Sequence, residues 1–180
     1  MLLVTLGTGV GGGIINEGKI LSGSTGSGGE IGHIHLVDGE PDACGCGNHG
    51  CFEQYASATG AVRIGRRVLA ASQKESVLRG KDFSCKDIFD AAKAGDALAT
   101  EIAKQYGEYL GKGLAIVASV INPEIIVLGG GVSRCGDMLF DLLKPSFEKY
   151  VFSGCRDAKF ALAELGNDAG IYGAAKMVIE

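Results

Sequence analysis

The stretch of residues 39–50 limits the fold of this chain more than any other, because it has almost nothing apolar to bury. It consists mainly of Gly, Asp, Asn, Pro and Cys and shows no apolar periodicity. Only something other than a hydrophobic core can give such a loop a fixed shape. Three cysteines, Cys44, Cys46 and Cys51, lie within eight residues, and the glycines between them let a short loop wrap around an ion. The pattern predicts a metal site, and three unrelated thiols are the alternative.

The fourth ligand of this site would be a histidine, which spacing alone does not identify. Thiolate sulfur and imidazole nitrogen are the ligands of closed, four-coordinate zinc sites, and one histidine would complete a Cys3His set. His33, His35 and His49 are all candidates. Across residues 30–37 apolar residues alternate with histidines, which predicts a strand with His33 and His35 on one face.

The composition predicts one compact domain in the cytoplasm. Of the 180 residues, 46% are apolar and 21% are charged, which suits one hydrophobic core. The net charge of −4 offers no basic stripe for phosphate backbones, so we expect no nucleic-acid partner. The first residues resemble neither a signal peptide nor a membrane helix, so we expect no membrane partner. In a reducing compartment the remaining cysteines would fill gaps without forming disulfides. They are Cys85, Cys135 and Cys155.

Apolar periodicity predicts a hairpin first and alternating strands and helices afterwards. The predicted strands are residues 2–6, 10–15, 30–37, 125–128 and 160–165. The predicted helices are residues 52–69, 86–94, 96–121, 137–150 and 169–179. Ser57 and Thr59 are candidate caps within the first of these helices. Antiparallel strands followed by βα units indicate an α/β domain with a mixed sheet.

Two glycine clusters follow predicted strands and would let a ligand approach the backbone. Residues 7–13 would point backbone amides and the Thr8 hydroxyl into one concavity suited to phosphate oxygens. A glycine-rich hairpin without a ligand explains this cluster equally well. Gly129, Gly130 and Gly131 permit close approach of a ligand at the carboxyl end of a buried strand, and a tight turn is the alternative.

Two glutamates flank the predicted metal site in the sequence. Glu30 stands three positions before His33, and Glu53 stands two positions after Cys51. A metal bound at both ends of this stretch would draw the two carboxylates together, where they would suit the hydroxyls of a sugar. The alternative is that both are solvated surface charges.

Four segments, in this order, resemble the ROK family of sugar kinases and repressors: LGTGVGGGII, GGEIGHI, CGCGNHGCFEQYAS and INPEIIVLGGGVS. The resemblance covers nearly the whole chain. It implies an actin-like, ribonuclease-H-like ATPase fold, with residues 1–180 as a C-terminal domain and residues 33–51 as its zinc loop. It places Thr8 and Gly9 near the nucleotide phosphates and residues 129–131 near the nucleoside. It also implies that the zinc ligands are His33, Cys44, Cys46 and Cys51.

The resemblance further implies ATP-dependent phosphorylation of a hexose, with Mg²⁺ accompanying ATP. The glycine loop and the segment GCFEQYASATGAVR are most similar to the glucokinase branch, so glucose is the expected substrate and glucose 6-phosphate the product. Kinases of N-acetylated hexosamines and of fructose share these motifs. Glu30, His33 and Glu53 would contact sugar hydroxyls, and the zinc would be structural because it orients His33 without taking part in the reaction.

One part of the implied machinery has no counterpart in this sequence. The family carries a DxGGT phosphate loop and an Asn-Asp pair whose aspartate acts as the general base, and neither precedes Leu2. We therefore expect a truncated C-terminal half that is inactive alone. Its exposed cleft surface favours self-association, and we expect a homo-oligomer such as a dimer. A sugar-sensing repressor effector domain and an inactive zinc-stabilised fragment are the alternatives.

Overall fold

The computed structural model describes residues 1–179 and places five strands in one mixed sheet. The strands are β1 (Leu2–Leu6), β2 (Val10–Asn16), β3 (Lys19–Ile20), β4 (Ile125–Gly129) and β5 (Lys159–Leu162). Their order across the sheet is β3-β2-β1-β4-β5. The pairs β1–β2 and β2–β3 are antiparallel, whereas β1–β4 and β4–β5 are parallel. The predicted hairpin, βα units and mixed α/β sheet are confirmed.

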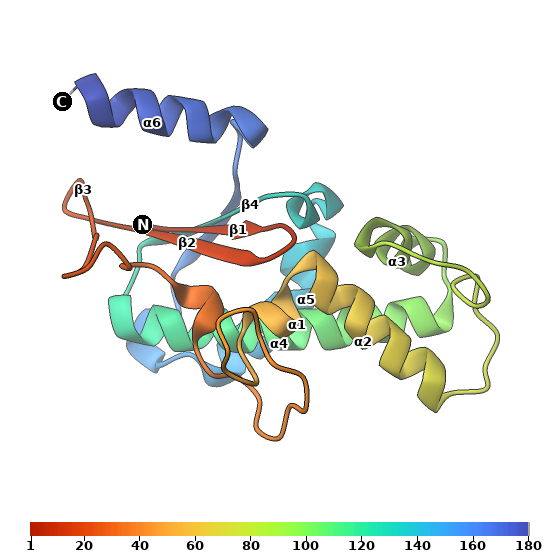
Figure 1. Cartoon of the computed structure of the whole chain (residues 1–180). Coiled ribbons are helices and arrows are strands. Elements are labelled where there is room, and N and C mark those ends of the chain that lie inside the picture. The colour runs from red at the N-terminus through yellow and green to blue at the C-terminus, as the bar shows by residue number, and fades with distance from the viewer. Residues whose placement is uncertain (180) are drawn as a thin grey trace.

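The helices gather mainly on one side of this sheet. The α-helices are α1 (Glu53–Ala56), α2 (Ala58–Ala71), α3 (Cys85–Lys93), α4 (Ala97–Ile121), α5 (Met138–Tyr150) and α6 (Ala169–Ile179). The short 3-10 helices are η1 (Ile31–His33), η2 (Val132–Cys135), η3 (Ser153–Cys155) and η4 (Gly166–Asp168). Figure 1 shows α1, α4 and α5 beneath the sheet, α2 and α3 beyond the β1–β2 turn, and α6 on the opposite side.

Helix α4 is the centre of the core. The Asp96 side chain caps its first turn by accepting a hydrogen bond from the Ala99 amide at 2.9 Å. Its last turn ends at Asn122, which adopts the left-handed conformation with φ 44°. A Cβ added at Gly111 would lie 2.2 Å from the Leu143 carbonyl oxygen, so only glycine lets α5 pack this closely. The buried side chains of α4 include Leu98, Ile102, Tyr106, Leu110 and Leu114.

The predicted strand over residues 30–37 is wrong. Residues Ile31–His33 form the 3-10 helix η1, and His35 makes only an isolated bridge with Cys51. Gly32 packs so closely on β2 that a Cβ there would lie 2.2 Å from the Val10 carbonyl oxygen. The segment therefore crosses over β2 and does not pair along it, and His33 and His35 do not share a strand face.

The segment predicted as helical, residues 52–69, is helical but forms two helices, because the chain breaks at Ser57. Ser57 has an extended backbone with ψ 172°, which separates α1 from α2. Its hydroxyl accepts a hydrogen bond from the Gly60 amide at 3.0 Å, so Ser57 is the N-cap of α2 as predicted. Thr59 is not a cap, since its hydroxyl donates to the Thr8 carbonyl oxygen at 2.8 Å.

Helix α6 follows β5 and stands apart from the other helices (Figure 1). Its side chains of Ile171, Tyr172 and Val178 are exposed. Within residues 1–179, no helix combines the length and the apolar character that crossing a bilayer requires.

Candidate metal centre and adjoining ligand site

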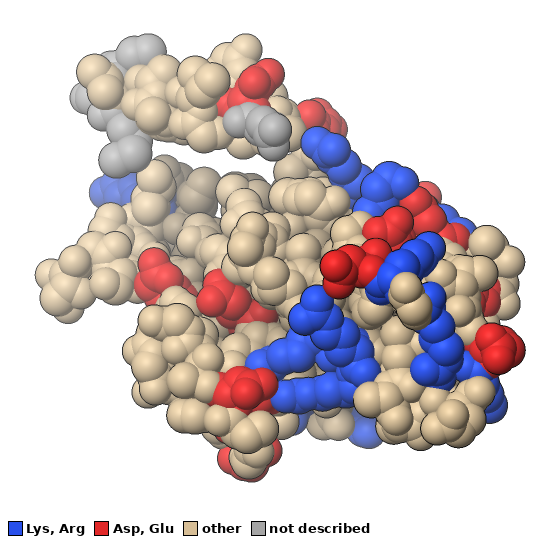
Figure 2. Space-filling model, turned by 45° about the vertical axis from the view of Figure 1, so that its right-hand side comes forward, with Lys and Arg blue, Asp and Glu red and all other residues tan. Residues whose placement is uncertain are grey.

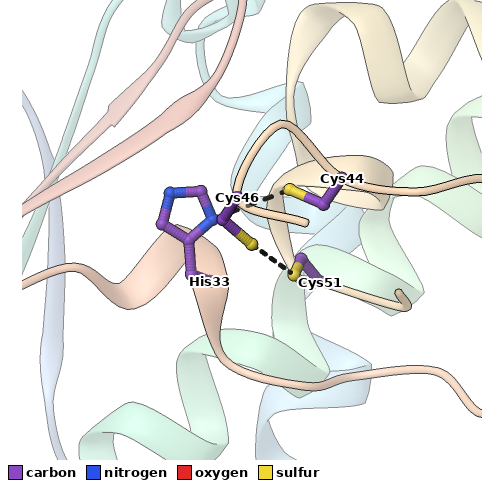
Figure 3. Close-up of side chains that lie close together, drawn as sticks. All are labelled: His33, Cys44, Cys46 and Cys51. Atoms are coloured by element: carbon purple, nitrogen blue, oxygen red, sulfur yellow. Dashed lines mark hydrogen bonds between the residues drawn. The ribbon is translucent and has the colours of Figure 1, made fainter. Parts of the chain in front are cut away.

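The structure brings one imidazole and three thiols together in the loop that the sequence singled out. The ligand atoms of His33, Cys44, Cys46 and Cys51 all lie within 4.8 Å of one another. His33 Nδ1 is 3.7 Å from Cys44 Sγ, and the sulfurs of Cys46 and Cys51 are 3.6 Å apart. Figure 3 shows the four side chains pointing toward one centre. A tetrahedral zinc with sulfur ligands at about 2.3 Å has sulfurs about 3.8 Å apart, so the four residues fit such an ion.

Local backbone structure explains how so short a loop presents three thiols. The Cys44 amide donates to the Asn48 carbonyl oxygen at 2.7 Å, and the Gly47 amide donates to the Cys44 carbonyl oxygen at 2.8 Å. Gly47 has φ 90°, a conformation that favours glycine. These bonds close a tight turn around Cys46, and Cys51 lies two residues before α1 begins at Glu53.

The thiols differ in their protonation. A hydrogen bond from the Asn48 backbone lowers the pKa of Cys46, which is the exposed thiol of the site. Burial raises the pKa of Cys51 to about 12. Cys51 is therefore a neutral thiol in the metal-free chain, and a metal ion binding there would displace its proton.

The other two histidines are engaged elsewhere. His35 Nδ1 lies 3.0 Å from the His49 carbonyl oxygen, and His35 Nε2 lies 2.8 Å from an Asp38 carboxylate oxygen. The hydrogen bond to Asp38 is the main cause of the raised pKa of His35. His49 Nδ1 lies 2.9 Å from the Glu40 carbonyl oxygen. Of the three candidates that spacing left open, His33 is the one that faces the cysteines.

Both predicted carboxylates lie beside the group of four potential metal ligands, which we call the metal cluster. A Glu53 carboxylate oxygen is 3.8 Å from Cys44 Sγ, and a Glu30 carboxylate oxygen is 4.0 Å from His33 Nε2. His33 therefore has one nitrogen toward Cys44 and the other toward Glu30. The Glu30 side chain is 65% exposed, which leaves it free to meet a ligand from solvent.

Glu53 also reaches the glycine hairpin, a link that the sequence did not reveal. Its Oε2 accepts a hydrogen bond from the Val10 amide at 3.0 Å. A Cβ at Gly9 would lie 2.1 Å from the same oxygen, so the approach requires a glycine. The hairpin is anchored on α2 as well, because the Ala58 amide donates to the Gly7 carbonyl oxygen at 2.8 Å. Thr8 at its tip is exposed.

The second glycine cluster borders a cavity of about 350 Å³. Gly130 has φ 86°, and a Cβ there would lie 2.5 Å from the Leu6 carbonyl oxygen, so this turn after β4 requires glycine. Ala58 lines the cavity and bonds the glycine hairpin, which makes the two regions neighbours. Sequence reasoning missed the α3 residues of this cavity, because their pattern is only that of an amphipathic helix. The lining includes Ala58, Ser84, Cys85, Phe89, Lys93, Gly131, Val132 and Cys135.

The cavity thiols are predominantly neutral. Burial raises the pKa of Cys85 to about 12 and that of Cys135 to about 11. They contribute apolar surface to the cavity and no charge.

This combination of fold and site has counterparts among known proteins. The model of the ROK family matches residues 1–180. The chain belongs to the ROK family. A glucokinase of Halalkalibacterium halodurans is 44% identical over 99% of this chain and 56% of its own length. An N-acetyl-D-glucosamine kinase of Vibrio cholerae is 32% identical over 97% of this chain and 57% of its own length.

Solved structures of ROK proteins share the fold. A ROK family glucokinase from Streptomyces griseus, in complex with glucose and AMPPNP, superposes with a TM-score of 0.87 at 36% identity, over 98% of this chain and 59% of its own. A ROK family transcriptional regulator, a homologue of the E. coli MLC protein, gives a TM-score of 0.82 at 32% identity, over 97% of this chain and 44% of its own. The actin-like ATPase fold expected from the sequence is confirmed.

The ROK chain described here spans only part of the length of these relatives. It covers 56% to 59% of the glucokinases and kinases of similar sequence. The chain thus aligns with just over half of the length of each of these relatives.

Proposed function

We propose that this chain is the C-terminal part of an ATP-dependent hexose kinase that converts glucose to glucose 6-phosphate. In this proposal residues 1–180 are one domain, with residues 33–51 as its zinc loop. The observation that carries it is the position of Glu53, whose carboxylate lies between the metal cluster and the glycine hairpin. In this proposal Glu53 binds the sugar and contacts the phosphate-binding hairpin through the Val10 amide, which would hold the two reactants close together.

The zinc ion would have a structural role. His33, Cys44, Cys46 and Cys51 would fill all four positions of a tetrahedral site, which leaves no open position for substrate. The ion would fix the His33 ring with Nε2 on the side of Glu30. Glu30, His33 and Glu53 would then bind the sugar hydroxyls, with the carboxylates accepting hydrogen bonds.

ATP would bind along the face that runs from the hairpin to the cavity. Backbone amides near Thr8 and Gly9 would hold the phosphates, and Gly129, Gly130 and Gly131 with the adjoining cavity would hold the nucleoside. Mg²⁺ bound with ATP would supply charge neutralisation for the phosphates. The chain's own residues thereby orient both reactants.

The general base of this reaction would lie outside the chain. We assign no residue of the sequence to that role, so the chain alone should be inactive. We further propose that the active protein is cytoplasmic, where ATP is available, and that it forms a homo-oligomer such as a dimer.

A second candidate is the effector domain of a sugar-sensing ROK regulator. The similarity to a ROK family transcriptional regulator with a TM-score of 0.82 favours it. A regulator that never binds ATP has no evident use for an exposed Thr8 in a glycine hairpin, which supports the kinase. An inactive zinc-stabilised fragment is the third reading, and it predicts no sugar-dependent stabilisation.

The test is an ADP-release assay on the whole protein that contains this chain. Glucose, N-acetyl-D-glucosamine and fructose are compared as substrates, and Glu53→Gln is the matched variant. We expect turnover with glucose foremost and a raised glucose KM in the variant. Sugar binding without turnover would contradict the kinase function and support the regulator function.

A further inference from the structure

The zinc loop contains a fully buried carboxylate, that of Glu40. The Glu40 side chain has no exposed surface. It accepts hydrogen bonds from Arg67 Nη2 and Nη1 at 2.9 and 3.1 Å, from Arg63 Nη2 at 3.2 Å and from the Asp42 amide at 3.1 Å. The Tyr55 hydroxyl donates a further one. We call the side chains of Glu40, Tyr55, Arg63 and Arg67 the Glu40 cluster.

The two arginines of this cluster face two carboxylates, those of Glu40 and Asp42. Burial alone would raise the pKa of Glu40, but the hydrogen bonds from Arg67 and Tyr55 outweigh it and lower the pKa to about 2. Arg63 and Arg67 also lie 3.7 and 3.6 Å from an Asp42 carboxylate oxygen. On the face that Figure 2 shows, Lys and Arg side chains lie next to Asp and Glu side chains. A buried carboxylate is tolerable only with such partners, so removing one of them leaves an uncompensated charge.

Two routes of hydrogen bonds start from the backbone of Glu40 and Asp42, whose side chains pair with the arginines, and reach the part of the loop that carries the cysteines. The Glu40 carbonyl oxygen is 2.9 Å from His49 Nδ1, which ties down the far side of the loop. The Asp42 carbonyl oxygen accepts from Gln54 Nε2 at 2.9 Å, and Gln54 Oε1 accepts from the Cys51 amide at 3.0 Å. Both routes run through side chains, those of His49 and Gln54, that lie outside the group of His33, Cys44, Cys46 and Cys51.

The cluster also fixes α1, which carries the proposed sugar-binding group. Arg63 Nη2 donates to the Gln54 carbonyl oxygen at 3.0 Å, and the Arg63 guanidinium lies 5.1 Å from the centre of the Tyr55 ring. Glu53 precedes both residues on the same short helix. One polar cluster therefore holds the metal loop against α2 and fixes the helix from which Glu53 reaches Val10.

Ordering a loop costs backbone conformational entropy at every residue that becomes fixed. If the ion alone ordered residues 39–50, that cost would be subtracted from its binding free energy. Contacts that order the loop beforehand remove part of the cost and raise the affinity.

We propose that the Glu40 cluster is a positioning site that orders the zinc loop before metal binds, so that Cys44, Cys46 and Cys51 stand ready as ligands. The inference rests on the proposed zinc site. It assigns to Glu40, Tyr55, Arg63 and Arg67 a role that neither spacing nor the resemblance suggested. If the cluster were merely structural, substitution of its residues would lower the stability of the chain and leave the affinity of the folded chain for zinc unchanged.

The experiment measures zinc affinity of the folded chain by competition with a chromogenic chelator, at a temperature where every variant is folded. Glu40→Gln should lose affinity by about tenfold to a hundredfold, which is typical for residues that support metal ligands. Alkylation of Cys51 in the metal-free chain should become faster, because this thiol is buried only while the loop is in place. Arg67→Ala should act in the same direction.

Asp96→Asn is the matched control. Asp96 is likewise a carboxylate that accepts several hydrogen bonds, but it caps α4 and supports residues 76–77, away from the loop. Its variant should lose stability and keep the parental zinc affinity. Tyr55→Phe keeps the ion pairs and removes one hydrogen bond, so it should weaken zinc binding to a smaller degree and replaces Glu40→Gln if that variant does not fold.

The outcomes separate the two proposals. Zinc bound equally well by the parent, Glu40→Gln and Tyr55→Phe overturns the positioning role alone. A parent chain that binds no zinc overturns both the zinc site and the positioning role.

Discussion

The core around α4 and the loop of residues 33–51 hold their shapes by different forces. In the core, fully buried apolar side chains and close-approach glycines pack α4 against α5 and the sheet. In the loop, a set of potential metal ligands and a buried carboxylate, which pairs with two arginines of α2, replace the apolar side chains. Core packing tolerates exchange of one apolar residue for another of similar volume, whereas each polar contact in the loop has one geometry and one partner. The loop should therefore respond to metal and to single polar changes, and the core should not.

The largest effect is expected from overpacking the core. Gly111→Val places a Cβ where the Leu143 carbonyl oxygen lies only 2.2 Å away, and backbone cannot yield as a side chain can. We expect a loss of more than about 4 kcal/mol, with no cooperative thermal transition by circular dichroism. Gly173→Ala, where an added Cβ meets open space, is the control. A folded Gly111→Val chain with a nearly parental Tm would contradict the packing.

Removing one ligand should lower the stability of the chain only through the loss of metal binding. Cys46→Ser should destabilise the chain by about 4 kcal/mol when free zinc is about a thousand times its Kd, because the parent gains that much from binding. In excess chelator the parent and the variant should melt at similar temperatures. An unchanged Tm of the variant in zinc would refute the metal site as a source of stability.

Gly9→Ala tests the junction between hairpin and metal site. The new methyl group would lie 2.1 Å from Glu53 Oε2 and displace the carboxylate from the Val10 amide. A hydrogen bond to a charged group contributes about 1.5 kcal/mol or more, so the glucose KM of the whole protein should rise about tenfold. Steady-state kinetics check this. A glucose KM equal to that of the parent would contradict the proposed role of Glu53 in binding the sugar.

The smallest effect is expected at the cap of α2. Ser57→Ala removes the acceptor of the Gly60 amide and should cost about 1 kcal/mol of unfolding free energy in urea titrations. Ser84→Ala removes the equivalent cap of α3 and should cost about the same. Because Ser57 separates α1 from α2, only its variant should also raise the glucose KM. Equal KM values in both variants would mean that the break at Ser57 does not position Glu53.

Sequence patterns predicted most of the core and only part of the loop. Helix α4 was readable because its apolar residues recur over 25 positions and because Asp96 and Asn122 mark its ends. The strand predicted at residues 30–37 failed because the alternation of histidines arises from a 3-10 turn and a bridge, which have no sequence period of their own. Ser57 was readable as a candidate cap, but the short helix α1 before it was not, because four residues are too few to show a helical period.

The tertiary polar contacts were beyond prediction for a physical reason. Glu40 meets Arg63 and Arg67 across 23 and 27 residues, and a charge pattern carries no information on such distant partners. The cysteine cluster was readable because its ligands are close in the sequence. Glu53 was recognised as a neighbour of the metal site, yet its bond to Val10 spans 43 residues and needed the fold.

Zinc K-edge X-ray absorption on the chain loaded with one equivalent of zinc tests the central claim most directly, namely that a metal completes a loop that no hydrophobic core supports. The account predicts one tightly held zinc with three sulfur ligands at about 2.3 Å and one nitrogen ligand at about 2.0 Å. A chain that retains no zinc, or an ion surrounded by oxygen and nitrogen ligands only, would contradict it.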